Sequence, residues 1–507
     1  MYRQISYSKK RKMVKNNKDT IDKIKKSQTL TDDEKSTLLG LLEKRKRYGL
    51  VWEDKPEDVE KELEENLPVF TEVKERALIN DTKDLHNPNH IIIEGDNLHA
   101  LTALSYTHEG KIDVIYIDPP YNTGNKDFVY NDKFMDSEDT YRHSKWLSFM
   151  SKRLKIAKQL LSKKGVIFIS IDDNEQAQLK LLCDEVFGES NLIANFTIAS
   201  NSAKNNAKFV SVTHEYLVGY AANKNLTPNP WAVKKNNLED FKSVAKKILK
   251  SDISLDEIHS ELLALVKYPK YYEFDHYTYT DKRGPFRASD LTAPSSTAFY
   301  DIIHPITKKT CKHGTRGWRF SKVEMQKLIE EGKILFGSDE NTIPQLKTYL
   351  SESEKSLPRS ILFFDSQAST KWMKAQKLDF PFPKALEYIK YILSFYPKSS
   401  YTILDFFAGS GTTLHATMQL NAEDGGHRQC ILVTNNENGI CENVTYERNK
   451  RVIEGYTSPK GEKVEGLHHN NLRYYKMDFV PREHTMKDYS DKRRSTNLQR
   501  FNFDPFT

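Results

Sequence analysis

The sequence has few cysteines and no long apolar run. Its four cysteines lie far apart and form no Cys-x-x-Cys pair; they are Cys183, Cys311, Cys430 and Cys441. A structural zinc site is therefore not expected, and we predict no bound metal. No apolar segment approaches the ~20 residues that a membrane-spanning helix needs, and the first residues are charged where a signal peptide would be apolar. These features predict a protein of the reducing cytoplasm, away from membranes.

The sequence also lacks a phosphate-binding P-loop, because no Gly-Lys-Ser or Gly-Lys-Thr follows a glycine-rich turn. It shows no convincing cluster of nuclease residues either. The visible motifs therefore provide neither an ATP-driven motor nor a nuclease, and any such activity must reside in a separate protein.

Positive charge is concentrated at the start of the sequence. The whole chain has a formal net charge of +7, and residues 1–27 alone contain ten Lys or Arg and two Asp. This segment is either a solvated tail or an arm that contacts nucleic-acid phosphates. A capping box at Thr31 and Glu34 and the amphipathic stretch 55–70 predict helices after it. Residues 1–85 are thus expected to form a basic arm and a helical N-terminal region.

From about residue 89 the sequence alternates short apolar strands with amphipathic helices. This βαβαβα succession is typical of a parallel sheet with helices on both faces. The alternation stops near Asn195 and resumes at about residue 371, so one α/β sheet is predicted from two segments around an insertion. The predicted divisions are 86–195 and 371–480 for the sheet, 196–370 for an inserted α+β domain and 481–507 for a polar tail.

A glycine-rich turn follows the predicted strand Thr402–Phe406. Gly409 and Gly411 let the backbone approach a ligand closely, and the helix that begins directly afterwards offers free N–H groups. Leu414 stands where a dinucleotide fingerprint has its third glycine, and a lone Gly-x-Gly is often only a turn. Glu437, after the next strand, can accept hydrogen bonds from a ribose. The pair favours a nucleoside-bearing ligand.

The segment Asp118-Pro119-Pro120-Tyr121 follows the apolar strand 112–117. In one interpretation it is only a rigid turn, because proline fixes φ and removes a donor. In the other it is a site: Asp118 and the carbonyl of Pro119 accept hydrogen bonds from an amino group, and Tyr121 offers a flat face to a planar ring. This set fits an exocyclic amine whose nitrogen must present its lone pair.

The two turns resemble the motifs of the amino-group DNA methyltransferases. Asp118–Tyr121 resembles their catalytic Asp-Pro-Pro-Tyr motif, and Phe407–Gly411 resembles their Phe-x-Gly-x-Gly motif for S-adenosylmethionine. The order, with the catalytic motif first and an insertion next, is similar to the circularly permuted β class. Other segments resemble the modification (Mod) subunits of type III restriction-modification systems and their solitary relatives; they are YGLVWE (48–53), IIIEGDNLHAL (91–101), THEGKIDVIYIDPPYNTGN (107–125), RHSKWLSFM (142–150) and GVIFISIDDNE (165–175).

The resemblance implies a Rossmann-like, S-adenosylmethionine-dependent enzyme that methylates N6 of an adenine flipped out of DNA. It assigns catalysis to Asp118, Pro119, Pro120 and Tyr121. The cofactor is expected to contact Asp96, Lys384, Glu437 and the turn residues Asp405, Phe406, Phe407, Ala408, Gly409, Ser410, Gly411 and Thr412. Asp96 is equally well explained as a helix N-cap. Where the family usually has Pro-Lys-Pro, this chain has Pro383-Lys384-Ala385, which loosens the helix start next to Lys384.

The insertion is expected to read the DNA sequence as a target-recognition domain. Lys and Arg are interleaved with aromatic residues at 268–287 and 313–320. Phosphate contacts would position such a domain and base-edge contacts would specify the sequence. Aromatic residues there are more often core residues than base-stacking ones. The candidate DNA contacts are Lys282, Arg283, Arg287, Arg316, Trp318 and Arg319.

The resemblance also implies double-stranded DNA as substrate, a homodimer, a place at the bacterial nucleoid and, for a restriction system, a separate ATPase and nuclease subunit. Three alternatives stay open. They are methylation of N4 of cytosine, methylation of protein glutamine or RNA, and a DNA-specificity subunit without catalysis. An aspartate rather than a serine at position 118 favours adenine, and the motif order disfavours a protein or RNA substrate. The intact Asp118, Tyr121, Gly409 and Gly411 disfavour a non-catalytic subunit.

Overall fold

The computed structural model describes residues 52–80, 87–130, 133–136, 139–200, 209–250, 253–365 and 367–482, together with Ser27. Most of the basic segment 1–27, the capping box at Thr31 and Glu34 and almost all of the tail 481–507 lie outside these ranges. The chain divides into two units, Met1–Glu53 and Asp54–Thr507. All the described helices and strands belong to the second unit.

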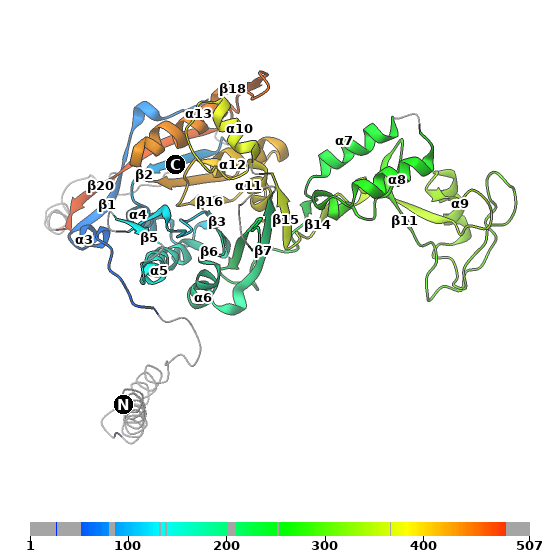
Figure 1. Ribbon diagram of the computed structural model, residues 1–507, viewed down its shortest axis with the longest axis horizontal. Coiled ribbons are helices and arrows are strands. Elements are labelled where there is room, and N and C mark those ends of the chain that lie inside the picture. The colour runs from blue at the N-terminus through cyan, green and yellow to red at the C-terminus, as the bar shows by residue number, and fades with distance from the viewer. Residues whose placement is uncertain are drawn as a thin grey trace, which may run out of the picture. The chain divides into compact units, whose positions relative to one another are not determined.

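A ten-stranded sheet forms the centre of this unit (Figure 1). Six neighbouring strands, from β20 to β6, run parallel, and β1 and β8 flank them in the antiparallel sense. This arrangement confirms the predicted α/β fold. In spatial order the strands are β1 (Asn66–Glu72), β20 (Asn471–Pro481), β2 (Asn89–Glu94), β17 (Gln429–Thr434), β16 (Thr402–Asp405), β3 (Ile112–Ile117), β6 (Leu161–Ile171), β8 (His214–Ala221), β7 (Leu192–Ser200) and β15 (Ile361–Phe364).

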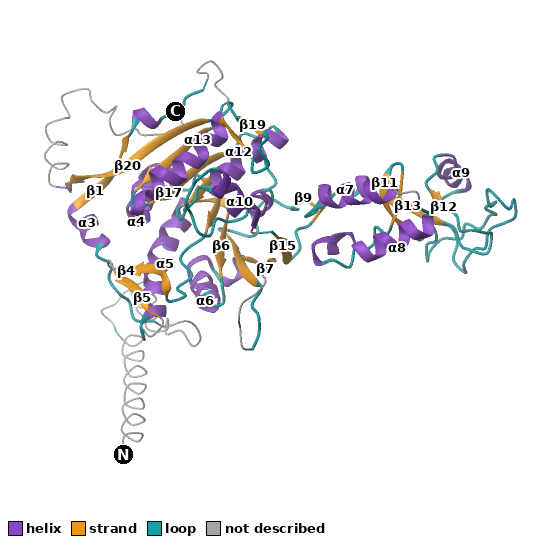
Figure 2. Ribbon diagram, turned by 45° about the horizontal axis from the view of Figure 1, so that its top comes forward, coloured by secondary structure: helices purple, strands orange, loops and turns teal. Residues whose placement is uncertain are grey.

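Helices cover both faces of the sheet, which explains why its central strands are continuously apolar. On one face, Ile92, Val114 and Ile403 pack in a single buried cluster with Ile389 and Leu414 of the covering helices. Figures 1 and 2 show the two helical layers on either side of the strands. One layer consists of α4 (Asn97–His108), α5 (Arg142–Leu160) and α6 (Gln176–Phe187), and the other of α11 (Leu386–Leu393), α12 (Thr412–Asp424) and α13 (Glu447–Glu454).

The insertion has an α+β fold with its own cores. A four-stranded antiparallel sheet runs in the order β10, β11, β13, β12. Phe241 stacks on Phe274 with ring centroids 4.4 Å apart in one of its cores. The elements are α7 (Leu238–Leu249), α8 (Leu255–Leu265), β10 (Tyr279–Asp281), β11 (Gly284–Ser289), α9 (Lys322–Glu330), β12 (Ile334–Leu335) and β13 (Gln345–Tyr349).

The boundaries of the insertion differ from the predicted 196–370. Strands β7 and β8 extend the central sheet to Ala221, and β15 rejoins it at Ile361. β7 mixes buried and partly exposed positions, so it lacks the continuous apolar run by which the central strands were recognised. β8 begins with the polar residues His214 and Glu215, and only its second part, 217–221, is continuously buried.

The N-terminal side of the second unit also differs from the prediction of a helix over 55–70. A short helix, α3 (Val59–Glu65), gives way to β1, which pairs with β20 at the edge of the sheet. Pro68 fits there because an edge strand does not need every backbone N–H for pairing. Within the described ranges, no helix combines the length and apolar character needed to cross a membrane.

Candidate active site

The two turns predicted to bind ligands follow the carboxyl ends of β3 and β16, at the same edge of the central sheet. β3 and β16 are parallel neighbours, with Val114 opposite Ile403 and Ile115 opposite Leu404. The segment Asp118–Tyr121 follows β3 directly, and the glycine-rich turn follows β16. β17 lies on the other side of β16, also parallel, so Glu437 follows a strand that ends at this edge. The sequence placed both turns at carboxyl ends of parallel strands, and the register brings them next to each other.

A lysine joins two carboxylates and a tyrosine at the first turn. The ammonium nitrogen of Lys384 lies 3.2 Å from Oδ1 of Asp118 and 2.8 Å from Oε2 of Glu215. It also donates to the hydroxyl of Tyr121 at 2.6 Å. That hydroxyl is 3.0 Å from Oδ1 of Asp118 and 2.9 Å from Oε2 of Glu215. The four side chains come from three separate stretches of the chain and form one polar cluster, the Asp118 cluster.

Burial sets the electrostatics of this cluster. It raises the pKa of Asp118 above the usual range, and the nearby ammonium of Lys384 acts in the opposite direction. Burial alone would lower the pKa of Lys384, but the carboxylates of Asp118 and Glu215 outweigh it and the net pKa is raised. Lys384 is therefore a permanent cation in the neutral pH range, and Asp118 is a carboxylate that accepts a hydrogen bond or proton readily.

The backbone of the first turn is fixed by side chains from α5 and α6. The indole nitrogen of Trp146 donates to the carbonyl of Pro120 at 2.7 Å. Asn122 has a φ of 59° and donates to Oε1 of Glu175 at 2.6 Å. His143 contacts the same oxygen through Nδ1 at 2.7 Å. These contacts hold the Asp-Pro-Pro-Tyr segment rigid, which a positioned acceptor needs.

Glu175 gives this support a pH dependence. Its side chain is fully buried, and burial raises its pKa from 4.5 to about 8. Between these two values the folded protein holds a proton that the unfolded chain releases, so stability falls as pH rises through this window. We expect Glu175→Gln to remove this decrease of the free energy of unfolding with rising pH. Urea denaturation of the wild type and the variant at several pH values measures it. If the free energies of unfolding of the two proteins changed in parallel with pH, the prediction would be wrong.

The glycine-rich turn is shaped by left-handed backbone and close packing. Gly409 and Gly411 have φ values of 48° and 73°, and a Cβ at Gly411 would lie 2.5 Å from Nδ2 of Asn449. Asp405 accepts from the N–H of Phe407 at 3.0 Å and from the hydroxyl of Thr413 at 2.5 Å. Burial raises the pKa of Asp405 to about 7. Asp405 thus holds the turn through hydrogen bonds rather than pointing freely at a ligand.

A buried arginine supports the same turn from α13. Nη1 of Arg448 donates to the hydroxyls of Thr412 at 2.6 Å and Ser410 at 3.1 Å. Arg448 is 1% exposed, and burial lowers its pKa. No sequence pattern pointed to this residue, because a lone arginine in an amphipathic helix is ordinarily a surface residue.

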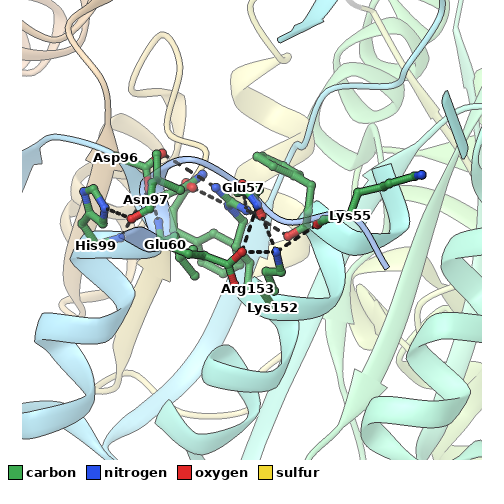
Figure 3. A network of polar contacts seen from close by, with 12 residues as sticks. Lys55, Glu57, Glu60, Asp96, Asn97, His99, Lys152 and Arg153 are labelled. Atoms are coloured by element: carbon green, nitrogen blue, oxygen red, sulfur yellow. Dashed lines mark hydrogen bonds and ion pairs between the residues drawn. The ribbon is translucent and has the colours of Figure 1, made fainter. Parts of the chain in front are cut away.

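A second polar network, drawn in Figure 3, connects the segment before α3 to this turn. Arg153 of α5 pairs with Glu57 at 2.9 Å and donates through Nε to Oδ1 of Asn97 at 2.6 Å. Asn97 in turn donates from Nδ2 to the carbonyl of Phe406 at 3.0 Å. Glu57 and Arg153 are both buried. Through these contacts, Glu57, Arg153 and Asn97 hold the backbone carbonyl of Phe406, the first residue after β16, in place.

Asp96 is the N-cap of α4, one of the two roles that the sequence analysis offered for it. Its Oδ1 accepts from the N–H groups of Leu98 at 2.7 Å and His99 at 3.3 Å. Glu437 is exposed in a short 3₁₀ turn after β17. Lys384, predicted to contact the cofactor, is a member of the Asp118 cluster. Its partner Glu215, which the sequence analysis assigned to the insertion, was not predicted.

The predicted DNA contacts in the insertion divide into two groups. Trp318 is wrong as a DNA contact: it is 1% exposed, packs in a core with Leu291 and donates through Nε1 to the carbonyl of Tyr300 at 2.8 Å. The remaining side chains are all exposed, which leaves them available to a polyanion; they are Lys282, Arg283, Arg287, Arg316 and Arg319.

A cavity of about 550 Å³ opens beside the Asp118 cluster. This volume lies within the ~300–1,000 Å³ typical of small-molecule sites. Both aromatic rings and charged groups line it, so it can accept a flat polar ring. Its lining includes Tyr121, Asp172, His214, Glu215, Phe364, Gln367, Thr370, Lys371, Lys374, Phe382, Lys384 and Tyr388.

Known proteins of similar sequence include the modification subunits of type III restriction-modification systems. The chain is 36% identical over 402 residues to the Mod subunit of the type III restriction-modification enzyme EcoP15I of Escherichia coli, covering 73% of this chain and 62% of that subunit. It is 32% identical to the StyLTI Mod subunit of Salmonella typhimurium, covering 73% of this chain and 56% of that protein. The chain thus spans about three fifths of these Mod subunits.

A shorter relative is matched over most of its length. This is the type II methyltransferase M.KpnI of Klebsiella pneumoniae, 33% identical over 386 residues, with 72% of this chain and 84% of that enzyme covered. The DNA methylase family matches residues 112–457, which contain both turns, the Asp118 cluster and the insertion. The predicted resemblance is confirmed, and the chain belongs to the N6/N4 DNA methylase family.

Proposed function

We propose that this protein transfers a methyl group from S-adenosylmethionine to N6 of adenine in DNA. The observation that carries the proposal is the parallel pairing of β3 with β16, which sets the amine-accepting Asp118 beside the glycine-rich turn. A methyl donor in that turn and an amine at Asp118 would then meet above one sheet edge. The relatives' names support DNA as the substrate, since they are restriction-modification and methyltransferase proteins.

The residues present fit S-adenosylmethionine. Gly409 and Gly411 give the turn a left-handed backbone, and α12 begins directly after it at Thr412 with its free N–H groups. Glu437, exposed after the neighbouring β17, is placed to accept hydrogen bonds from ribose hydroxyls. When bound, the cofactor supplies an electrophilic methyl group on a cationic sulfur.

The base must leave the duplex to reach Asp118, which costs a few kcal/mol. Stacking on an aromatic ring returns about 1–3 kcal/mol per base, and Tyr121 lines the cavity beside the cluster. Asp118 and the carbonyl of Pro119 then accept hydrogen bonds from the two N6–H groups. This holds the nitrogen lone pair toward the methyl donor. After transfer the nitrogen is cationic, and Asp118 is the nearest group to receive its proton.

Lys384 and Asp118 are already paired before the base arrives, at 3.2 Å. The incoming amine therefore replaces one partner of Asp118. Glu215, 2.8 Å from Lys384, keeps that ammonium in place when the exchange occurs. Glu215 is thus a positioning residue that frees Asp118 for the substrate at small electrostatic cost.

Adenine is preferred over N4 of cytosine because position 118 is an aspartate and not a serine. Incubating the protein with deuterated S-adenosylmethionine and DNA, then measuring labelled nucleosides by mass spectrometry, tests this directly. Labelled N6-methyl-2′-deoxyadenosine is expected. Label in N4-methylcytosine supports the alternative, and label in RNA or protein but not in DNA refutes the proposal.

Sequence reading is assigned to the insertion, whose exposed cations face solvent. We expect Arg287→Gln and Arg319→Gln each to weaken DNA binding by about tenfold, within the ~1–3 kcal/mol of a base or phosphate contact, with no change in thermal stability. Trp318→Ala should instead cost about 3–5 kcal/mol of folding stability, because it empties a core. Fluorescence anisotropy with labelled DNA and thermal unfolding separate the two effects. Normal DNA binding by both arginine variants would contradict this assignment.

The likeness to Mod subunits extends the proposal to partners. In this view the protein acts in the bacterial cytoplasm on double-stranded DNA as a homodimer, and a separate restriction subunit supplies ATP hydrolysis and cleavage if the system restricts. Size-exclusion chromatography with light scattering, with and without DNA, tests the dimer.

A further inference from the structure

One face of helix α10 (Gln367–Ala375) lines the cavity next to Lys384. Four of its residues, Gln367, Thr370, Lys371 and Lys374, contribute to the cavity wall. Their spacing of three and four residues places them on a single helical face. The helix is anchored on its other side, where Ser369 and Met373 are buried and the Ser369 hydroxyl accepts from the N–H of Leu386 at 3.0 Å. The cavity-lining face is therefore held in a fixed orientation.

The two lysines of this face are cations that the cavity does not neutralise. Lys371 and Lys374 are exposed, and neither forms an ion pair with any residue that the structure describes. Of the acids in the cavity wall, Glu215 is paired with Lys384 at 2.8 Å, and Asp172 accepts from the backbone N–H of Asn174 at 2.9 Å.

Lys390, on the neighbouring α11, is paired, because its ammonium lies 2.5 Å from Glu423 and 3.2 Å from Glu387. Lys371 and Lys374 have no such carboxylate partner among the described residues, so they can accept an anion from outside. A large aromatic ring accompanies them, because Phe382 also lines the cavity and is 86% exposed. Free cations beside an exposed ring are the combination that binds a nucleotide backbone together with its base.

We propose that Lys371 and Lys374 bind the phosphates that flank the extruded nucleotide. This rests on the proposed function. A base that flips rotates about its own backbone, so the flanking phosphates stay at the cavity mouth while the base enters. Lysine binds phosphate as a point charge without reading sequence. The α10 face then holds the flipped strand, and the insertion reads the duplex.

The first test is the salt dependence of DNA binding by the double variant Lys371→Gln/Lys374→Gln. Each lost phosphate contact lowers the slope of log K against log salt by about 0.9, so a decrease of about 1–2 is expected on two unrelated mixed-sequence duplexes alike. The KM for DNA should rise while kcat and S-adenosylmethionine affinity stay unchanged. Lys371→Arg/Lys374→Arg should keep the slope.

Lys163→Gln is the matched control. Lys163 is exposed near the start of β6, at the opposite edge of the sheet from the cavity. This variant should bind DNA like the wild type. A salt slope that is the same in Lys371→Gln/Lys374→Gln as in the wild type would overturn the proposal, and so would a loss of cofactor affinity with an unchanged slope.

The second test locates the phosphates. Once nucleoside analysis has identified the methylated site, neutral methylphosphonate linkages can replace the phosphates on either side of the target base. The wild type should lose affinity for this duplex, and the lysine variant, which already lacks the contact, should lose little or none. Equal losses in both proteins would refute the contact. A wild type that methylates no DNA would instead refute the proposed function, which keeps the two failures distinct.

Discussion

Asp118→Ala is expected to lower the rate of methyl transfer to DNA by roughly 10³-fold, the size of effect seen when a positioned electrostatic group is removed. The variant loses the acceptor that orients the amine and the group that receives its proton. Binding of S-adenosylmethionine should be unchanged, because the glycine-rich turn is held by contacts that do not involve Asp118, among them those of Asp405 with Phe407 and Thr413. Single-turnover transfer of labelled methyl and calorimetry of cofactor binding measure the two quantities.

Two further variants make this result specific. Asp118→Asn keeps the shape and one acceptor oxygen but removes the charge, so its rate should fall between those of the wild type and Asp118→Ala. Asp256→Asn, an exposed position in the first turn of α8, should behave like the wild type. Activity of Asp118→Ala within a factor of about 10 of the wild type is incompatible with an electrostatic role of this size.

The sheet centre and the location of the site were predictable because both depend on local pattern. The strands around Ile91, Val114 and Ile167 are buried on both faces, and that burial requires the continuous apolar runs by which they were recognised. Ligands of such sheets bind at the carboxyl ends of the strands. An aspartate and a glycine-rich turn that directly follow two such runs could therefore be assigned to one edge before the register was known.

Glu215 could not be predicted in the same way. It lies in the polar first part of β8, before the continuously buried residues 217–221, and both neighbours of this strand, β6 and β7, run antiparallel to it. Its role depends on a register that brings Oε2 within 2.8 Å of Lys384, a residue 169 positions away. Trp318 shows the opposite error, because it was predicted to be a functional residue and is a core residue. Its arginine neighbours suggested a nucleic-acid surface, but the indole is buried in the core while Arg316 and Arg319 are exposed.

The contact of Glu57 with Arg153 shows a third limit. Both residues stand in charged, amphipathic stretches that are typical of exposed helix faces. Arg153 is buried only because the segment before α3 crosses α5 and supplies a carboxylate at 2.9 Å. Sequence pattern identifies a face as polar, but it does not say that another polar segment covers it.

Lys384→Met should show how strongly the Asp118 cluster depends on its cation. The substitution leaves the carboxylates of Asp118 and Glu215 close together in a partly buried site with no positive charge between them. Removing one partner of a buried pair typically costs about 3–5 kcal/mol, and partial exposure reduces the expected loss here to about 2–3 kcal/mol. Urea denaturation measures the loss. Lys390→Met removes an ammonium from two exposed carboxylates, Glu387 of α11 and Glu423 of α12. It should cost less than about 1 kcal/mol and leave methyl transfer unchanged.

The pH dependence of the Lys384→Met defect distinguishes lost charge from lost packing. Without the ammonium, the pKa of Asp118 in the folded protein rises further above its unfolded value, so the folded variant gains a proton that the unfolded chain gives up. Its stability should therefore improve as pH falls, and the gap to the wild type should narrow toward about pH 4. Adding Glu215→Gln should restore most of the stability at neutral pH without restoring methyl transfer, because it removes the repulsion but not the need to hold the amine. A defect of constant size across pH, which the second substitution does not relieve, would show that Lys384 contributes packing and not charge, and the exchange of Lys384 for the substrate amine at Asp118 would then have no electrostatic basis.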